Sequence, residues 1–281
     1  FSGILGAFNA LTSKTIQGNL IVNSTGTGRL RAVTTGVLTI NGNLQINAGI
    51  FEVGSNNGSV IVKGTTTVAS GSTLDFNRGS LKNQGNMILN GNALSSETST
   101  VNSYLEFSGS GVPQTLTGTG TFTGRISNLG VSNPLGLTLS IPLVTENVYL
   151  IAGTITNSSN ITFGSGSTLS RFVQIGSATN ITSGGNFDSS PNFNMGTGTY
   201  TIYYLKETTP RVIGFEIPST KSINSLYLDN ASGLTISGGS LEVLNTLTLA
   251  NGIINTTNTN SIIHGSPTIA GTITGGSTTS Y

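Results

Sequence analysis

Few side chains in this sequence could take part in acid–base chemistry, and the most suggestive of them are two carboxylates. Asp75 follows Glu52 at the interval expected for one turn of a coil of short strands, and Arg78 follows Asp75 closely. Carbohydrate-active enzymes use such carboxylates as acid, base or nucleophile, and an arginine can stabilise developing charge. A β-helical hydrolase or polysaccharide lyase is therefore one alternative. Solvated outer positions balanced by Arg78 or Lys63 are the simpler interpretation, and we expect no catalytic residue and no enzyme.

A second group of residues could bind a ligand without changing it. Tyr203, Tyr204, Lys206 and Arg211 lie close together in the sequence. Aromatic rings can stack on sugar rings, and Lys and Arg donate hydrogen bonds to sugar hydroxyls. A glycan-binding module is the other alternative. The opposing structural interpretation is that one tyrosine packs inward and the other shields a loop.

The residue inventory narrows the possible chemistry further. His264 is the only histidine and there is no cysteine. A multi-histidine site, a cysteine-ligated metal and a disulfide are therefore excluded, and a Ser-His-Asp triad would have to use His264. We interpret His264 as a packing or surface residue and expect no metal ion and no cofactor.

Charge and hydropathy also exclude partners. Only 7% of the 281 residues are charged and the formal net charge is +1, whereas a typical soluble domain is about 25% charged. With 11 Lys and Arg, the chain lacks the basic surface that binds nucleic acid phosphates. No apolar run approaches the roughly 18 residues of a membrane span, so no membrane insertion is expected.

The elements that must position these residues are short strands. Apolar residues alternate with polar ones in brief segments, for example at 20–22, 37–40, 44–46, 51–53, 60–62 and 74–76. Alternation predicts strands with one inward face, and no stretch shows helical periodicity. Pairs such as Asn41-Gly42, Asn90-Gly91 and Asn251-Gly252 separate the segments. We expect them to supply positive φ angles at sharp corners.

The spacing favours a right-handed parallel β-helix, a β-solenoid, over a sandwich or barrel. Three short strands with their corners take roughly 23 residues, which predicts about 12 turns stacked about 4.8 Å apart. A longer repeat supports this interpretation: residues 126–140 align with residues 223–237 at an offset of 97. Like charges stacked at this spacing would repel, which is one reason for their scarcity.

No domain boundary is evident. We expect residues 1–281 to form a single continuous solenoid segment of a longer protein. Residues 186–218 carry Pro191, Pro210 and Pro218. Because proline interrupts ladder hydrogen bonds, an irregular insertion, a protruding loop or an aromatic cap is predicted there.

Two phrases carry a resemblance to a known group of proteins. Residues 237–257, SGGSLEVLNTLTLANGIINTT, resemble the repeats of large secreted surface proteins of Bacteroidota, and residues 104–120, YLEFSGSGVPQTLTGTG, resemble the segment that often precedes them. The resemblance covers the chain from about residue 100 onward. It implies a type 9 secreted adhesin of the bacterial cell surface, similar to gliding-motility adhesins and to filamentous-haemagglutinin-like β-helices.

The function expected from architecture and resemblance together is mechanical. The chain would serve as a stiff stalk within an extracellular adhesin or filament used for attachment or gliding. Its partners would be surfaces or glycans and other segments of the same long protein.

Overall fold

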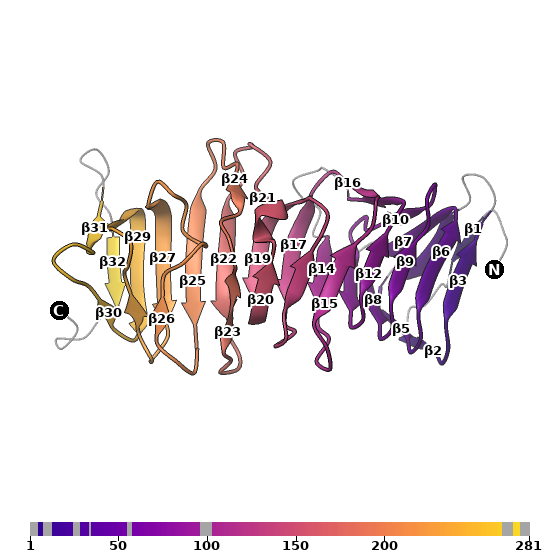
Figure 1. Ribbon diagram of the computed structural model, residues 1–281, viewed down its shortest axis with the longest axis horizontal. Coiled ribbons are helices and arrows are strands. Elements are labelled where there is room, and N and C mark those ends of the chain that lie inside the picture. Colours follow the sequence, from indigo (N-terminus) through magenta and orange to yellow (C-terminus); the bar gives the residue numbers. More distant parts are fainter. Residues whose placement is uncertain are drawn as a thin grey trace.

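Stacked turns of parallel strands build the molecule (Figure 1). The computed structural model describes residues 5–7, 13–24, 29–33, 35–54, 58–95, 103–265 and 272–275. Within these ranges the only helix is the short 3-10 segment η1 (Ser158–Asn160). The predicted all-β fold and β-solenoid are confirmed, with about ten turns instead of twelve. Turn length varies, because the stacked partners Leu129 and Val148 are closer in sequence than the stacked partners Val173 and Ile202.

The described strands form four sheets. A six-stranded sheet contains β1 (Leu5–Ala7), β4 (Arg29–Val33), β7 (Ile50–Gly54), β10 (Thr73–Asp75), β13 (Asn92–Leu94) and β16 (Thr121–Thr123). An eight-stranded sheet contains β3 (Leu20–Asn23), β6 (Leu44–Ala48), β9 (Thr66–Val68), β12 (Met87–Leu89), β15 (Gln114–Thr117), β18 (Leu137–Leu139), β20 (Ala152–Thr156) and β23 (Gly184–Phe187). A three-stranded sheet contains β26 (Arg211–Val212), β28 (Leu234–Thr235) and β30 (Ile254–Asn255).

The largest sheet runs the length of the stack. Its path is β2 (Lys14–Ile16), β5 (Val37–Ile40), β8 (Ser59–Val62), β11 (Ser80–Asn83), β14 (Tyr104–Phe107), β17 (Ile126–Val131), β19 (Leu143–Leu150), β22 (Arg171–Gly176), β25 (Tyr200–Leu205), β27 (Ser222–Asp229), β29 (Leu241–Asn251) and β31 (Ile262–His264). Beside this path lie β21 (Ile161–Phe163), β24 (Asn192–Phe193) and β32 (Thr272–Gly275). The single histidine, His264, is the last residue of β31.

A ladder of aliphatic side chains fills the interior behind the large sheet. Alternation within each strand turns every second residue inward, and the parallel register stacks these residues directly on one another. The ladder consists of Leu38, Val60, Leu81, Leu105, Leu129, Val148, Val173, Ile202, Leu226 and Leu247. All ten are buried. Leu129 and Leu226 lie four turns apart, which explains the sequence repeat with offset 97.

The Asn-Gly corners need glycine for two different reasons. Gly252 has the predicted positive φ, 99°. Gly42 is not in that conformation, and the prediction of a positive φ is wrong there. A Cβ on Gly42 would instead overlap the Asn19 side chain and lie 2.8 Å from the carbonyl carbon of Gly18. At this corner glycine is required because stacked turns approach closely.

The stretch 186–218, predicted to be irregular, is mixed. It contains β25, a regular strand paired with β22 on one side and β27 on the other. Tyr200, the first residue of this strand, forms an aromatic cluster with Phe163 and Phe193, with ring centroids 5.6–5.9 Å apart. In the following irregular segment, Ile213 and Ile217 are buried, so this segment packs on the core and does not simply protrude.

Candidate functional site

The two carboxylates singled out in the sequence do stack. Asp75 in β10 is the direct strand partner of Glu52 in β7, one turn apart in the six-stranded sheet. The side chain of Glu52 is 1% exposed and that of Asp75 is 9% exposed. The one-turn spacing therefore placed them together correctly, but they are buried and not solvated.

Two arginines from the preceding turn neutralise this pair. Arg29 donates to Glu52 at 2.8 Å and to Asp75 at 2.6 Å, and Arg31 donates to Glu52 at 2.7 Å. Arg78, the arginine that the sequence suggested, is exposed, and its backbone N–H donates to Gly54. The grouping of Glu52, Asp75 and Arg78 is thus not assembled.

Electrostatics favour a structural role for this network. Burial by itself raises the pKa of Glu52, but hydrogen bonds from Arg31, Asn77 and Arg29 outweigh it and hold the pKa below the ordinary value. A catalytic general acid needs the opposite, a raised pKa. The arrangement is an ion-pair clamp that ties three successive turns together.

The clamp makes a pH-dependent contribution to stability. Because the pKa of Glu52 is lowered by folding, its stabilising effect is present above the ordinary value of 4.5 and is lost as the pH falls through the lower folded pKa. We expect the stability advantage of the wild type over Glu52→Gln to shrink in this acid range. Urea denaturation of both proteins from neutral to acid pH measures it. A difference that stays constant would contradict the prediction.

The four predicted ligand-binding residues do not share one surface. Tyr203 lies on the outer face of β25, whereas its neighbour Tyr204 points into the interior and is fully buried. Tyr204 donates a hydrogen bond to Glu216 at 2.7 Å. Lys206 occupies the corner after β25 with φ of 42° and donates to the carbonyl of Ala178.

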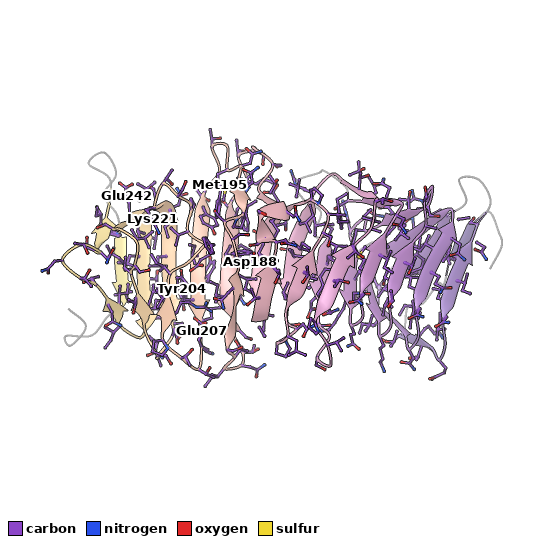
Figure 2. All side chains as sticks on the ribbon, in the orientation of Figure 1. Asp188, Met195, Tyr204, Glu207, Lys221 and Glu242 are labelled. Carbon is purple, nitrogen blue, oxygen red and sulfur yellow. The ribbon has the colours of Figure 1, made fainter. Side chains whose placement is uncertain are left out.

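Arg211, the fourth of these residues, is buried beside Glu207. Figure 2 shows Glu207, with Tyr204, in the C-terminal third of the stack. Its Nε lies 3.0 Å from Glu207 Oε1, and its other nitrogens donate to Glu207, Asn186 and the carbonyl of Gly185. Burial raises the pKa of Glu207 despite the opposing effect of Arg211. Glu207 and Arg211 satisfy each other and are 5% and 8% exposed, so they are not placed to meet a ligand.

A row of aromatic rings lies on the outer face of the large sheet, and Tyr203 is part of it. We call this row the aromatic stripe: Tyr104, Tyr149, Phe172, Tyr203 and Tyr227. Consecutive ring centroids are 5.8, 5.2, 5.7 and 5.7 Å apart, and the first three contacts are edge-on. All five are half-buried.

One turn of the stripe carries no ring of its own. At that level stands Gly130, the strand partner of both Glu106 and Tyr149. A Cβ on Gly130 would overlap the hydroxyl of Tyr104. The missing side chain therefore lets the Tyr104 ring reach across this turn to Tyr149.

Phe172 is a ring of the stripe with an edge contact on each side. Such contacts are worth about 0.5–1.5 kcal/mol each beyond area burial. Phe172→Ala is therefore expected to lower the free energy of unfolding by about 1–3 kcal/mol, measured by urea denaturation. Thr201→Ala, at the strand partner of Phe172 on β25, is the control. Equal small effects of the two substitutions would show that the rings do not support one another.

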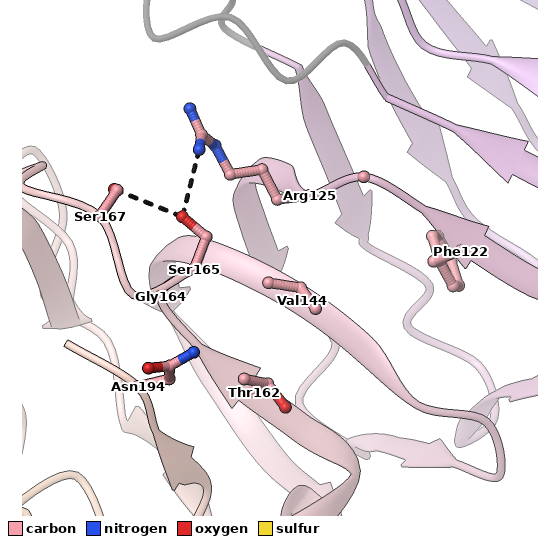
Figure 3. A pocket seen from close by; sticks show the side chains of 9 residues that line it. Phe122, Arg125, Val144, Thr162, Gly164, Ser165, Ser167 and Asn194 are labelled. Carbon is pink, nitrogen blue, oxygen red and sulfur yellow. Dashed lines mark hydrogen bonds between the residues drawn. The ribbon is translucent and has the colours of Figure 1, made fainter. Parts of the chain in front are cut away.

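A pocket beside β21 holds an arginine that sequence reasoning did not single out. It has a volume of about 630 Å³. Figure 3 shows Arg125, Ser165 and Ser167 on one side, Thr162 and Asn194 on another. The Arg125 guanidinium donates to the Ser165 hydroxyl at 3.2 Å.

Behind the pocket wall, Glu146 receives two arginines. Arg171 Nε lies 2.6 Å from one carboxylate oxygen, and Arg125 Nε lies 3.2 Å from the other. The Arg171 side chain is fully buried and that of Arg125 is 13% exposed. The three residues come from three successive turns, and only the spacing of about one turn between each arginine and Glu146 could have pointed to them.

In the part of the chain that the structure describes, no group of three or more His, Asp or Glu side chains lies close enough to hold a metal ion. None of the described residues belongs to a helix long and apolar enough to cross a membrane.

No family model matches the chain, and neither a curated protein nor a solved structure matches it.

Proposed function

We propose that this chain is a stiff stalk segment of an extracellular bacterial surface adhesin or filament, serving attachment or gliding. The observation that carries the proposal is the unbroken interior ladder behind the large sheet, from Leu38 to Leu247. Each turn bonds its backbone to the next and stacks an aliphatic side chain on the one below. Bending or stretching the rod would have to break both kinds of contact.

The surface location rests on the resemblance of residues 104–120 and 237–257 to repeats of secreted Bacteroidota adhesins. The low charge agrees with a structural role, because this surface offers little for electrostatic steering of a partner. Its partners in this role are surfaces or glycans and neighbouring segments of the same long protein.

An antiserum raised against the purified chain tests the location. We expect it to label intact cells of the source organism and to reduce their attachment to a surface. An antiserum against a cytoplasmic protein, which labels only permeabilised cells, is the control. Labelling of the chain only after permeabilisation would overturn the proposal.

Glycan binding is a second candidate function, and the aromatic stripe favours it. Five half-buried rings in a row along the axis offer apolar surface to a sugar chain lying parallel to the rod. On a glycan array, Tyr203→Ala combined with Tyr227→Ala should abolish binding, whereas Thr201→Ala should leave it unchanged. Binding that survives the double substitution would reject the stripe as the site.

A further inference from the structure

The charges around Glu146 do not balance. Among the described residues, one carboxylate, Glu146, faces two guanidinium groups, Arg125 and Arg171. The cluster therefore carries one surplus positive charge beside a pocket. A charge held in a partly buried place is costly unless it is compensated.

Arg171 alone is sufficient to neutralise the buried Glu146 carboxylate. Its Nε donates to Glu146, one terminal nitrogen donates to the carbonyls of Leu169 and Met195, and the other donates to the carbonyl and the hydroxyl of Ser167. These bonds use all five N–H donors of a guanidinium. Glu146 would thus keep a buried charged partner without Arg125.

Arg125 is used differently. Its Nε faces Glu146 and its Nη1 donates to Ser165, while its Nη2 makes no hydrogen bond to any residue that the structure describes. In Figure 3 the outer nitrogens of this guanidinium extend beyond the Ser165 hydroxyl. A guanidinium with N–H donors that no described residue accepts matches a carboxylate, which accepts two parallel hydrogen bonds.

The rest of the pocket supplies the groups that recognise a sugar. The hydroxyls of Thr162, Ser165 and Ser167 and the amide of Asn194 line it, and Phe122 provides a half-buried aromatic ring. The side chain of Asn194 makes no hydrogen bond within the described residues and is exposed. The volume of about 630 Å³ lies in the usual range of small-molecule sites, about 300–1,000 Å³.

We propose that this pocket binds an acidic sugar, with Arg125 holding the sugar carboxylate and the surrounding hydroxyl and amide groups holding its hydroxyls. The proposal concerns different residues from the stalk and from the aromatic stripe, so its failure leaves both unaffected. Binding is weakened by salt, because the contact is between charges that are partly exposed.

Calorimetric titration of the whole chain with oligogalacturonate tests the proposal. Arg125→Gln is expected to weaken binding about ten- to a hundredfold, the usual contribution of a charged hydrogen bond. The affinity of Arg125→Lys should lie between those of Arg125→Gln and the wild type. Asn194→Ala, which breaks no hydrogen bond within the described residues, should weaken binding severalfold. Arg78→Gln, which removes an exposed arginine elsewhere, is the charge-matched control and should bind as the wild type does.

Two comparisons separate an acidic-sugar site from weaker alternatives. A neutral galacto-oligosaccharide of the same length should not bind, and acetate at equal carboxylate concentration should not displace the oligogalacturonate. The proposal is overturned if the wild type does not bind oligogalacturonate or if Arg125→Gln binds equally well. Equal binding of the neutral sugar, or displacement by acetate, would also reject it. Thermal melts of Arg125→Gln should match the wild type, which shows that loss of binding is not loss of folding.

Discussion

Replacement of Glu146 by alanine is expected to lower the free energy of unfolding by about 3–5 kcal/mol, the usual cost of leaving a buried charge without its partner. Arg171 is fully buried and has Glu146 as its carboxylate partner. Its other hydrogen bonds go to neutral oxygens, which cannot replace a negative charge. Urea denaturation followed by circular dichroism measures the loss.

Arg125→Gln is the matched control, because it removes a charge from the same cluster and leaves the pair of Glu146 and Arg171 intact. Its expected effect is much smaller than that of Glu146→Ala, because Glu146 and Arg171 keep each other as buried charged partners. Hydrogen exchange should rise in β19 and β22 for Glu146→Ala and stay unchanged for Arg125→Gln. Equal destabilisation by both substitutions would mean that the two arginines carry equal structural weight.

The parallel stack could be predicted from the sequence because each strand encodes its own inward face. In a strand such as β5, Leu38 and Ile40 are buried while Val37 and Thr39 are not. This alternation needs no information from elsewhere in the chain. The repeat with offset 97 also indicated that the turns stack, since residues such as Leu129 and Leu226 recur at the same place on the turn.

The ligand-binding patch was less predictable, and part of the reason is the same alternation. Tyr203 and Tyr204 are adjacent in one strand, so they face opposite sides of the sheet. The alternation ends with β25 at Leu205, and Lys206 then adopts a positive φ. Beyond that corner, no local pattern reveals that Arg211 turns inward.

Contacts between turns are the hardest to read from the sequence, because the turns differ in length. More residues separate Val173 from its stacked partner Ile202 than separate Leu129 from its stacked partner Val148. A single fixed period therefore found the stacked carboxylates of the six-stranded sheet, whereas Arg125 and Arg171 lie only approximately one such period from Glu146. The number of residues in each corner decides which residues of successive turns stack, and the strand pattern does not specify that number.

Charges are scarce in this chain, and the described ion pairs show how the remaining ones are tolerated. Stacking was expected to make like charges repel. Lys82 and Glu106 are direct strand partners with opposite charges, 3.1 Å apart. Arg31 and Glu52 are another such pair. A stacked sheet therefore admits a charge where a neighbouring turn supplies the opposite sign, as Arg29 does for the like-charged strand partners Glu52 and Asp75.

Leu129→Ala is expected to lower the free energy of unfolding by about 2–5 kcal/mol, as for other leucines removed from closely packed interiors. Leu129 is fully buried between Leu105 and Val148 in the interior ladder. The substitution leaves a cavity that neither neighbour can fill, because each is held in place by its own backbone ladder. Urea denaturation measures the loss.

The position of the cavity along the rod should matter as much as its size. In a stack each turn contacts only the turns next to it, so stability is close to a sum of nearest-neighbour terms. Leu247→Ala makes the same chemical change near the C-terminal end of the described stack, where Leu247 pairs with β27 and β32. There a weakened interface releases only the last turns, whereas at Leu129 it divides the rod. Hydrogen exchange should therefore rise on both sides of β17 for Leu129→Ala and only beyond β27 for Leu247→Ala. If both variants lost protection uniformly along the chain, the rod would unfold as one unit and the nearest-neighbour description would fail.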